Sequence, residues 1–442
     1  MVWPPPAQKC MNQNQSVVIQ PAKNINGVVR LPGDKSISHR YVMLAALAEG
    51  TSVLKNFSTS ADCASTLGCV RALGTSVAIK DNNTVEISGC GRELKKPEVA
   101  LDCGNSGSTM RMLAGILAGQ GFVSELVGDE SLSRRPMARI MDPLQQMGAR
   151  IEAQSSRAPL CVHGAGRALK GIEYRMPVAS AQVKSSILFA GLLAQGETVV
   201  EEPVRTRDHG ELALRAFGAE IGGANNRARI RGGQQLHAIH AEIPGDISSA
   251  TFFLCAAAIF PESSLVMEDV LLNPRRAAVL DVLTQMGARV RVVEISERLG
   301  ELVGTVKIEG GSLSGARIAG ALSAALIDEL PALAAIAPFT RDGVEIRDAA
   351  ELRVKESDRI ATVAANLRAM GATVEEHTDG MQIPGGQRLH GAAVDSHGDH
   401  RIAMAFTVAA LRASGETQVQ GADAVRISYP DFFNVLKSLV AS

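Results

Sequence analysis

Six stretches of this chain repeat one pattern, and this repetition constrains the fold more than any other feature. Each stretch has a turn containing Gly or Ser, then a polar or charged cluster, then an apolar helix rich in Ala, Leu and Met. The stretches begin at Gly33, Gly104, Ser180, Gly245, Asp328 and Gly398. In the first five, a second expected helix ends 38 to 44 residues later at a Gly: Gly74, Gly148, Gly218, Gly287 and Gly371. Gly commonly follows a helix end, and a fixed period of this length predicts an internal repeat.

Strand-like segments follow each of these glycines. Residues 76–88 are one example, in which the Asp81-Asn82-Asn83 run predicts a hairpin turn. The sixth repeat begins so close to the last residue that its trailing strands are missing. Two N-terminal segments, Ser16–Gln20 and Gly27–Leu31, are candidates to replace them. We therefore expect the N-terminal segment to pair with the last repeats.

The repeats favour two domains, because 442 residues are too many for one ordinary core. Two Pro-Gly-Asp turns, near 32–34 and 244–246, are well placed as a double hinge. We expect residues 33–246 to form one domain with repeats 1–3, and residues 16–32 plus 247–442 to form the other with repeats 4–6. Residues 1–15 are expected to be a disordered tail, with Met11 as an alternative start. The alternative is one large α/β domain with coincidental glycine spacing.

Composition excludes several classes of function. The formal net charge is −1 and aromatic residues make up 3%, which argues against a general nucleic-acid or membrane-surface binder. No uncharged apolar run reaches the length of a transmembrane span, and the first residues lack the apolar core of a signal peptide. The seven cysteines include no Cys-x-x-Cys pair, as in a chain with reduced thiols. We expect a cytoplasmic protein.

Cationic residues at the starts of the repeat helices indicate a site for anionic small molecules, because a helix N-terminus carries unpaired N–H groups and partial positive charge. The first cluster holds Lys35, Ser36 and Arg40. It lacks the glycine spacing of a nucleotide-binding P-loop, because Asp34 precedes the lysine. A solvated helix end explains this segment alone equally well.

Later repeats add further candidates. Ser180 and Gln182 are neutral donors, whereas Lys184 in the same helix is free to face solvent. Arg134 and Arg135 precede a helix opened by Pro, and such paired arginines are often only solvated. In residues 351–360, a helix would place Lys355 and Arg359 on one face at i,i+4, together with Glu356. Like charges there repel unless an anion lies between them.

The last repeats contain acidic residues as well. Residues 395–400 hold Asp395, His397, Asp399 and His400, but their spacing matches no zinc signature. An anion site that includes His400 and Arg401 fits better. Asp328 and Glu329 open an apolar helix, where a carboxylate ordinarily serves as the N-cap. Near a cationic cluster, Asp328 would instead serve as a catalytic base.

Seven motifs, in this order, closely resemble the EPSP synthase family. They are LPGDKSISHR (31–40), GNSGSTMR (104–111), SRRPM (133–137), SAQVKSS (180–186), IPGDISSA (243–250), RVKESDRI (353–360) and DHRIAM (399–404). The resemblance covers residue 16 to the C-terminus, and SAQVKSS with the TRDH at 206–209 looks like the class II bacterial type. It implies the enolpyruvyltransferase fold, an α/β inside-out barrel of six βαβαββ repeats, three per domain. It also implies transfer of the enolpyruvyl group of phosphoenolpyruvate to shikimate 3-phosphate, with release of phosphate and with domain closure.

The resemblance carries roles to particular residues. For shikimate 3-phosphate it implies contacts with Lys35, Ser36, Arg40, Ser180, Gln182, Arg207, Asp328 and Lys355. For phosphoenolpyruvate it implies contacts with Lys35, Gly107, Arg135, Gln182, Arg359 and Arg401. Asp328 would accept the hydroxyl proton, Glu356 and Lys35 would protonate the methylene, and His400 and Asp399 would support the anion site. No cofactor and no metal are expected, nor a nucleic-acid or membrane partner, and the protein is expected to be a monomer.

Three positions bear on how closely the chain follows the family. Part of the family has a Lys just before the C-terminal aromatic–Pro pair, where this chain has Ser428, and Arg426 is a candidate replacement. Ala181 takes the place of a Ser. Gly107 leaves room at the phosphoenolpyruvate site, so we expect the inhibitor glyphosate to fit there.

Three other functions are compatible with parts of this pattern. A UDP-N-acetylglucosamine enolpyruvyltransferase shares the fold and donor, but its opening Lys-Asn segment and loop Cys are missing. A non-catalytic anion-binding protein of the same fold would be expected to lack Lys35, Asp328, Glu356 or Arg401, and all four are present. RNA-end chemistry on a similar fold is disfavoured by the low aromatic content and the lack of a basic stripe.

Overall fold

The computed structural model describes residues 15–441, so the expected tail up to residue 14 and the alternative start at Met11 lie outside the described residues. The chain divides into two compact units. Unit 2 comprises Pro32–Pro244 and Glu297–Leu302, and unit 1 comprises the chain up to Leu31, Gly245–Ser296 and the chain from Val303 onward. The chain passes from unit 1 to unit 2 between Leu31 and Pro32 and returns between Pro244 and Gly245, at the two Pro-Gly-Asp turns. The backbone N–H of Asp34 donates to the carbonyl of Pro244 over 2.7 Å.

The apolar helix that opens each repeat forms in all six places. These helices are α1 (Lys35–Leu47), α3 (Gly107–Ala118), α6 (Ala181–Leu193), α8 (Ile247–Ala258), α11 (Leu330–Ile336) and α13 (His400–Leu411). They are buried almost all round, and every residue of α8 and α13 is buried. A helix that is apolar on every face belongs in a core. Accordingly α3 packs on α1 and α6 within unit 2, and α8, α11 and α13 pack on one another within unit 1.

The second helices end as the glycine spacing predicts. They are α2 (Ala61–Ala72), α5 (Ala138–Gln146), α7 (His209–Ala216), α9 (Ala278–Gln285) and α12 (Arg359–Ala369). Each predicted glycine lies two residues past the last helical residue, with φ between +89° and +110°. Only Gly adopts this left-handed conformation without strain, so the five predicted helix ends are confirmed.

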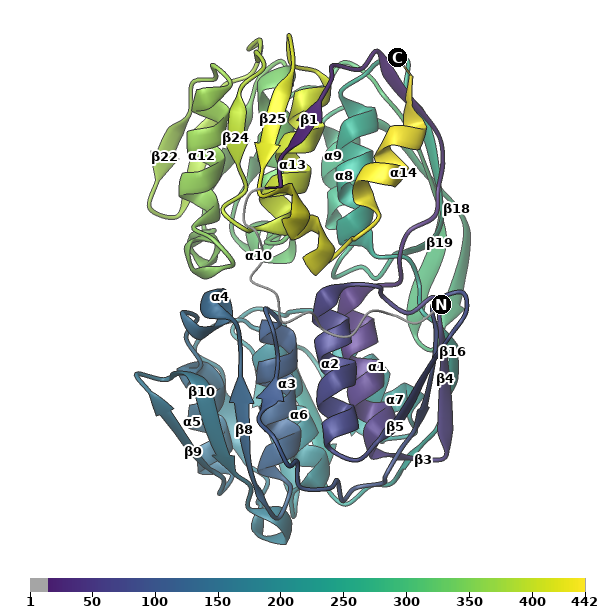
Figure 1. Cartoon of the computed structure of the whole chain (residues 1–442), viewed down its shortest axis with the longest axis vertical. Coiled ribbons are helices and arrows are strands. Elements are labelled where there is room, and N and C mark those ends of the chain that lie inside the picture. Colours follow the sequence, from purple (N-terminus) through teal and green to yellow (C-terminus); the bar gives the residue numbers. More distant parts are fainter. Residues whose placement is uncertain (1–14, 442) are drawn as a thin grey trace. The chain divides into compact units, whose positions relative to one another are not determined.

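Three four-stranded sheets and one strand pair belong to unit 2 (Figure 1). The first sheet has the order β16 (His240–Glu242)-β4 (Thr51–Lys55)-β6 (Thr84–Ser88)-β5 (Ser76–Lys80), and the second has the order β7 (Leu101–Asp102)-β8 (Val123–Val127)-β10 (Arg157–His163)-β9 (Arg150–Gln154). The third has the order β11 (Glu173–Arg175)-β12 (Glu197–Glu201)-β14 (Arg227–Arg231)-β13 (Ile221–Gly222). The strand pair is β15 (Leu236–His237)-β3 (Ala48–Glu49). The predicted hairpin is confirmed, since β5 and β6 are antiparallel and Asn82 and Asn83 have positive φ.

Unit 1 holds three further sheets. Their orders are β18 (Arg289–Arg298)-β19 (Glu301–Glu309)-β17 (Ser264–Leu271)-β2 (Asn24–Val29)-β26 (Val440–Ala441), then β20 (Ala316–Ile318)-β21 (Val344–Ile346)-β23 (Gly380–Ile383)-β22 (Glu375–His377), and β1 (Val17–Ile19)-β25 (Thr417–Gln420)-β24 (Ala393–Asp395). The N-terminal segment pairs with the last repeat as expected, because Val17 lies opposite Val419.

Each of the six larger sheets contains one parallel strand pair. In four of these pairs the opening helix of the repeat lies between the two strands in sequence, which is a βαβ unit. In the other two the strands are exchanged at the crossings, so that β2 pairs with β17 in unit 1 and β16 pairs with β4 in unit 2. The remaining short helices are α4 (Glu130–Ser133), α10 (Ala321–Ala325), α14 (Phe432–Leu439) and the 3₁₀ segments η1 (Gly166–Ala168), η2 (Ala337–Phe339), η3 (Ala350–Val354) and η4 (Ala422–Ile427).

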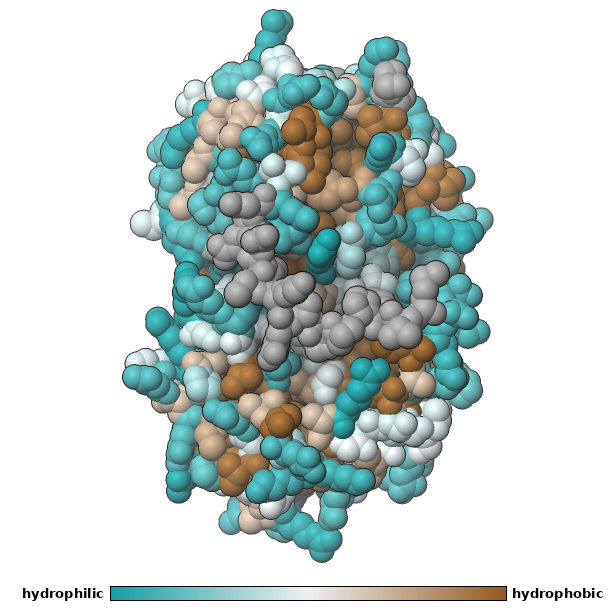
Figure 2. Space-filling view, viewed as in Figure 1, coloured by the Kyte–Doolittle hydropathy of each residue, from teal (hydrophilic) through white to brown (hydrophobic). Residues whose placement is uncertain are grey.

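Hydrophilic side chains cover much of the face seen in Figure 2, with apolar side chains in separate patches between them. Within residues 15–441, no helix combines the length and apolar character needed to cross a membrane. All the cysteines in that range are free thiols, and four of them are buried.

Candidate active site

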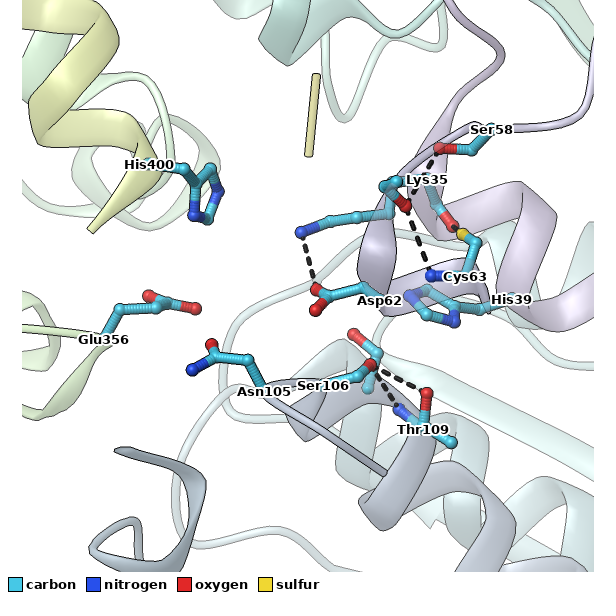
Figure 3. Close-up of polar contacts among 12 residues, drawn as sticks. Lys35, His39, Ser58, Asp62, Cys63, Asn105, Ser106, Thr109, Glu356 and His400 are labelled. Carbon is cyan, nitrogen blue, oxygen red and sulfur yellow. Dashed lines mark hydrogen bonds and ion pairs between the residues drawn. The ribbon is translucent and has the colours of Figure 1, made fainter. Parts of the chain in front are cut away.

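The start of α1 joins the start of α2 through a charged pair in unit 2. Asp34 caps α1 by accepting from the backbone N–H of Ile37 over 2.8 Å, and Lys35 is the first helical residue. The Lys35 ammonium lies 2.9 Å from Asp62 Oδ2, with only 15% of the lysine side chain and 9% of the aspartate side chain exposed (Figure 3). The predicted cation is therefore held in place by a carboxylate that the sequence analysis did not single out.

A chain of buried polar side chains lies behind Lys35. His39 Nδ1 is 2.6 Å from the Thr66 hydroxyl, which lies 2.7 Å from the Thr109 hydroxyl. Thr109 donates in turn to Ser106 (Figure 3). Burial lowers the pKa of His39 well below its usual range, and the nearby cations Lys35 and Arg40 lower it further. His39 is therefore neutral, and the chain fixes α1, α2 and α3 together without adding charge near Lys35.

Arg40 links α1 to α6. Arg40 is 3% exposed, and its guanidinium donates to the Ser36 carbonyl over 2.8 Å and to the Ser185 hydroxyl over 3.0 Å. It also donates to the Ala181 carbonyl over 3.5 Å. The backbone of residue 181 thus takes part in this contact, whatever its side chain. Ser36 is half-buried in the first turn of α1, and Ser180 is the N-cap of α6.

A second group forms around the start of α3. Arg111 donates to Gln182 Oε1 over 2.7 Å, and Gln182 Nε2 donates to the Ser108 hydroxyl over 2.9 Å. A Cβ on Gly107 would lie 2.8 Å from an Arg111 nitrogen and 3.5 Å from an Arg135 nitrogen. Gly107, Gln182 and Arg135, predicted from three separate motifs, are therefore brought together. Arg111 was missed, although it falls inside the GNSGSTMR motif.

The two arginines before α5 differ in environment. Arg135 is 7% exposed and donates to Asn105 Oδ1 over 2.7 Å and to the Ser131 hydroxyl over 3.1 Å. The Arg134 side chain is 69% exposed and pairs with Glu130, which is also exposed. Only Arg135 is therefore positioned by its surroundings, and Arg134 is a solvated surface residue.

Lys184 does not face solvent, and that expectation is wrong. Its side chain is 2% exposed, and its ammonium lies 2.9 Å from Glu202 and 2.6 Å from Glu211. Almost the whole of this helix is buried, so the lysine is buried with it and two carboxylates compensate its charge. Glu202 also accepts from the backbone and hydroxyl of Thr206, next to Arg207, which is half-buried in the loop before α7.

In unit 1, Arg359 is the centre of a buried ionic network. Its side chain is 1% exposed, with Nε 2.8 Å from Asp399 and one terminal nitrogen 2.7 Å from Glu356. Burial works to lower the pKa of Arg359, but Asp399 and Glu356 outweigh it, and the pKa is raised. Asp399 also caps α13 by accepting from the Arg401 N–H, and His400, the first residue of that helix, is buried.

Three cations surround Asp328. Its carboxylate oxygens lie 4.0 Å from the Lys355 ammonium, 3.7 Å from Arg359 and 3.8 Å from Arg401. Arg401 also donates to the Asp328 carbonyl over 2.7 Å. Burial lowers the pKa of Lys355, an effect that Asp328 partly offsets. A carboxylate among cations, still 16% exposed, can both bind an anionic substrate through its neighbours and accept a proton from it.

The expected helix through Lys355 and Arg359 is wrong. Lys355 follows η3 in an extended conformation, and α12 begins only at Arg359. The break arises because Asp358 caps α12, accepting from the Ala361 N–H over 3.0 Å. The two cations thus reach Asp328 from different elements rather than as i,i+4 neighbours.

The ordinary explanation of Glu329 as a capping carboxylate also fails. Glu329 is the N-cap of α11, but its side chain makes no capping hydrogen bond. It is fully buried, accepts from the Ser248 hydroxyl and lies 3.8 Å from the buried Arg276. In contrast, the other five opening helices have side-chain caps. Unpaired N–H groups at helix N-termini therefore contribute less to this site than the sequence suggested, and cationic side chains contribute more.

Arg426, the candidate for the missing C-terminal lysine, is exposed on η4. The neighbouring Tyr429 is buried and its hydroxyl donates to the Arg30 carbonyl over 3.4 Å. The local structure thus orders the aromatic–Pro segment and leaves Arg426 at the surface.

Comparisons with known proteins identify the family of the chain. Residues 19–436 match the sequence profile of EPSP synthase (3-phosphoshikimate 1-carboxyvinyltransferase). The chain is similar to the 3-phosphoshikimate 1-carboxyvinyltransferases of Koribacter versatilis, with 62% identity over 96% of this chain and 99% of that protein, and of Solibacter usitatus, with 53% identity over 95% and 99%.

A solved structure shows the same likeness in three dimensions. EPSP synthase from Acinetobacter baumannii is 41% identical, with a TM-score of 0.86 over 97% of this chain and 98% of that one. This agreement confirms the expected α/β enolpyruvyltransferase fold. The chain belongs to the EPSP synthase (3-phosphoshikimate 1-carboxyvinyltransferase) family.

Proposed function

We propose that this chain transfers the enolpyruvyl group of phosphoenolpyruvate to the 5-hydroxyl of shikimate 3-phosphate and releases phosphate. This is a transferase step of the shikimate pathway, toward chorismate and the aromatic amino acids. The observation that carries the proposal is the convergence of Lys355, Arg359 and Arg401 on the Asp328 carboxylate. It occurs in a chain whose relatives carry this activity in their names.

The charges of the two substrates match the cations of the site. Each phosphate monoester brings roughly 1.5 to 2 negative charges near neutral pH, and each substrate adds a carboxylate. Cations held by partners, as Lys35 is by Asp62 and Arg359 by Asp399, are fixed in position before substrate arrives. Fixed cations stabilise developing charge better than mobile ones, because they need not reorganise during the reaction.

We assign the proton transfers to the carboxylates and Lys35. Addition of a proton to the methylene carbon of phosphoenolpyruvate builds positive charge at its C2, which the shikimate hydroxyl oxygen attacks. Asp328 accepts the hydroxyl proton, and Glu356 and Lys35 are the partners at the methylene. The adduct then loses a proton from its methyl group and its phosphate leaves, so the enol double bond is restored.

Substrate contacts follow the motifs. For shikimate 3-phosphate we propose Lys35, Ser36, Arg40, Ser180, Gln182, Arg207, Asp328 and Lys355. For phosphoenolpyruvate we propose Lys35, Gly107, Arg135, Gln182, Arg359 and Arg401. We further propose domain closure about the two Pro-Gly-Asp turns on binding, a class II bacterial type, inhibition by glyphosate, a monomeric state and a cytoplasmic location.

The activity is tested by phosphate release from phosphoenolpyruvate in the presence of shikimate 3-phosphate. A parallel reaction contains UDP-N-acetylglucosamine instead, and neither contains added metal. Release with shikimate 3-phosphate alone supports the proposal. Release with the nucleotide sugar alone, or with neither acceptor from folded protein, overturns it.

Replacing Gly107 with Ala raises the KM for phosphoenolpyruvate about tenfold, which corresponds to about 1.4 kcal/mol. The new Cβ would lie 2.8 Å from an Arg111 nitrogen, so Arg111 shifts and its hydrogen bond to Gln182 is strained. Steady-state kinetics measure the change. Gly68→Ala is the control, because a Cβ at Gly68 in α2 meets no atom within 4 Å. An unchanged KM in Gly107→Ala would show that this corner does not contact the substrate.

Replacing Lys355 with Arg moves the alkaline limb of the kcat/KM profile to higher pH. Burial lowers the pKa of Lys355, so its ammonium loses a proton at lower pH than an ordinary lysine, and kcat/KM falls there. A guanidinium stays charged throughout this range. Profiles from about pH 7 to about pH 10 for both proteins locate the limb. Ionisation of the substrates affects the parent protein and the variant equally. If the alkaline limbs of the two profiles coincide, deprotonation of Lys355 is not their cause.

A further inference from the structure

Three metal-ligating side chains gather on the exposed face of the β7-β8-β10-β9 sheet, outside the clusters described above. Residues of β10 alternate in burial, with Leu160 and Val162 inward and Cys161 and His163 on the outer face. Glu152 on β9 lies directly opposite Cys161 in the strand register, so its side chain points to the same face. Figure 1 shows β10 between β8 and β9.

We propose that Glu152, Cys161 and His163 bind one zinc-class divalent cation. Their ligand atoms all lie within 4.8 Å of one another. This proposal concerns a face of unit 2 that the proposed reaction does not use, and it does not depend on that reaction.

The distances fit a shared ion. Cys161 Sγ is 3.6 Å from His163 Nε2, and His163 Nε2 is 3.5 Å from Glu152 Oε1. Tetrahedral zinc with bonds of about 2.3 Å to sulfur and about 2.0 Å to nitrogen and oxygen separates its ligands by roughly 3.3 to 3.6 Å. The same three atoms can therefore surround one ion with small side-chain rotations.

The chemistry of the donors selects the metal. One thiolate, one imidazole and one carboxylate suit Zn²⁺ or Co²⁺, whereas Mg²⁺ and Ca²⁺ require oxygen ligands. Three protein ligands leave a fourth coordination position open. On the side of β10 away from β9, Glu125 of β8 lies opposite Cys161 in the strand register. Water or this second carboxylate would complete the coordination.

Metal binding should release a proton that can be measured, because the Cys161 thiol must lose its proton to bind the ion. Arg150 holds the pKa of Glu152 below its usual range, so the carboxylate is ready to bind. Burial raises the pKa of the Cys161 thiol, and Glu152 and Glu125 raise it further. The thiol therefore carries its proton at neutral pH, and forming the metal–sulfur bond releases about one proton per ion to solvent.

Arg150 competes with the cation. Its guanidinium donates to the same Glu152 oxygen that faces His163, with Nε at 2.8 Å. It must release that oxygen when the metal binds. Removing this competitor, in Arg150→Ala, therefore tightens binding, a change opposite to that of a ligand variant.

The test is titration of the chelator-treated full chain with Co²⁺, followed by competition with Zn²⁺. We expect one Co²⁺ per chain with a near-ultraviolet thiolate-to-cobalt absorption band, and calorimetry in two buffers should report about one proton released. Cys161→Ser loses the band and weakens binding at least about tenfold, and His163→Ala weakens it as much, each about 1.4 kcal/mol or more.

Matched controls separate this site from other thiols and imidazoles. Cys90 is the other half-buried cysteine among the described residues, and His237 is exposed on β15. Cys90→Ser and His237→Ala keep the band and the affinity. Absence of the band from the parent chain, its persistence in Cys161→Ser, or its loss in Cys90→Ser overturns the proposal. Unchanged far-ultraviolet circular dichroism verifies folding of each variant.

Discussion

Replacing Asp328 with Ala lowers kcat at least about 100-fold, in the range expected for removal of a general base. The carboxylate lies within 4.0 Å of Lys355, Arg359 and Arg401, so it is the acidic group around which this cationic cluster is built. This variant would lack the base proposed for the hydroxyl proton, while the cations proposed to bind the anionic substrates would remain. We therefore expect a large loss in kcat and a small change in KM.

Asp328→Asn is the companion variant, since it keeps the size of the side chain and removes only its charge and basicity. Steady-state phosphate release gives kcat and KM, and circular dichroism verifies the fold. Glu345→Gln serves as the control, because Glu345 on β21 is also a carboxylate paired with arginines, Arg317 and Arg347. Parental kcat in both Asp328 variants would remove this residue from the mechanism.

Replacing Arg359 with Met lowers the free energy of unfolding by about 3 to 5 kcal/mol, because it leaves the buried Asp399 carboxylate without its cation. Asp399 is fully buried, 2.8 Å from Arg359 Nε, and Glu356 lies 2.7 Å from the same guanidinium. Urea unfolding followed by circular dichroism measures the change. Arg359→Lys restores the charge without the paired hydrogen bonds, so its loss should be intermediate.

Arg317→Met is the matched control for this measurement. The Arg317 side chain is 74% exposed, 3.3 Å from Glu345, and an exposed pair contributes less than about 1 kcal/mol. Equal losses in Arg317→Met and Arg359→Met would contradict the buried network as the source of stability.

The repeat architecture could be predicted because its signals are local. A glycine that needs positive φ, such as Gly74 or Gly371, marks a helix end through its own backbone, and an apolar helix indicates burial without knowledge of its neighbours. Five repeats with both signals at a similar spacing reinforce each other. The motif residues Lys35, Arg135 and Gln182 likewise lie at positions that the repeat defines.

What the sequence did not show depends on contacts between distant segments. Lys184 looks like a solvent-facing lysine until Glu202 and Glu211 are brought to it by β12 and α7. Asp62 gains its role only because α2 begins beside Lys35. The break between Lys355 and Arg359 had a local signal in the Ser357-Asp358 pair, a common helix start. The i,i+4 spacing favours one continuous helix, whereas the Asp358 side chain caps a helix that begins at Arg359.

The pairing of the first strand with the last repeat determines the order in which the units can fold during synthesis. Gln418 donates to Ser16, 402 positions earlier, so β1 waits roughly 20 to 80 s for its partner at about 5 to 20 residues per second. Unit 2 is almost complete once Pro244 has emerged. It lacks only Glu297–Leu302, whose Glu301 lies 2.6 Å from the buried His209. A nascent chain therefore holds a nearly finished unit 2 while the apolar helices of unit 1 still await β25, and this interval is when it most needs protection from aggregation.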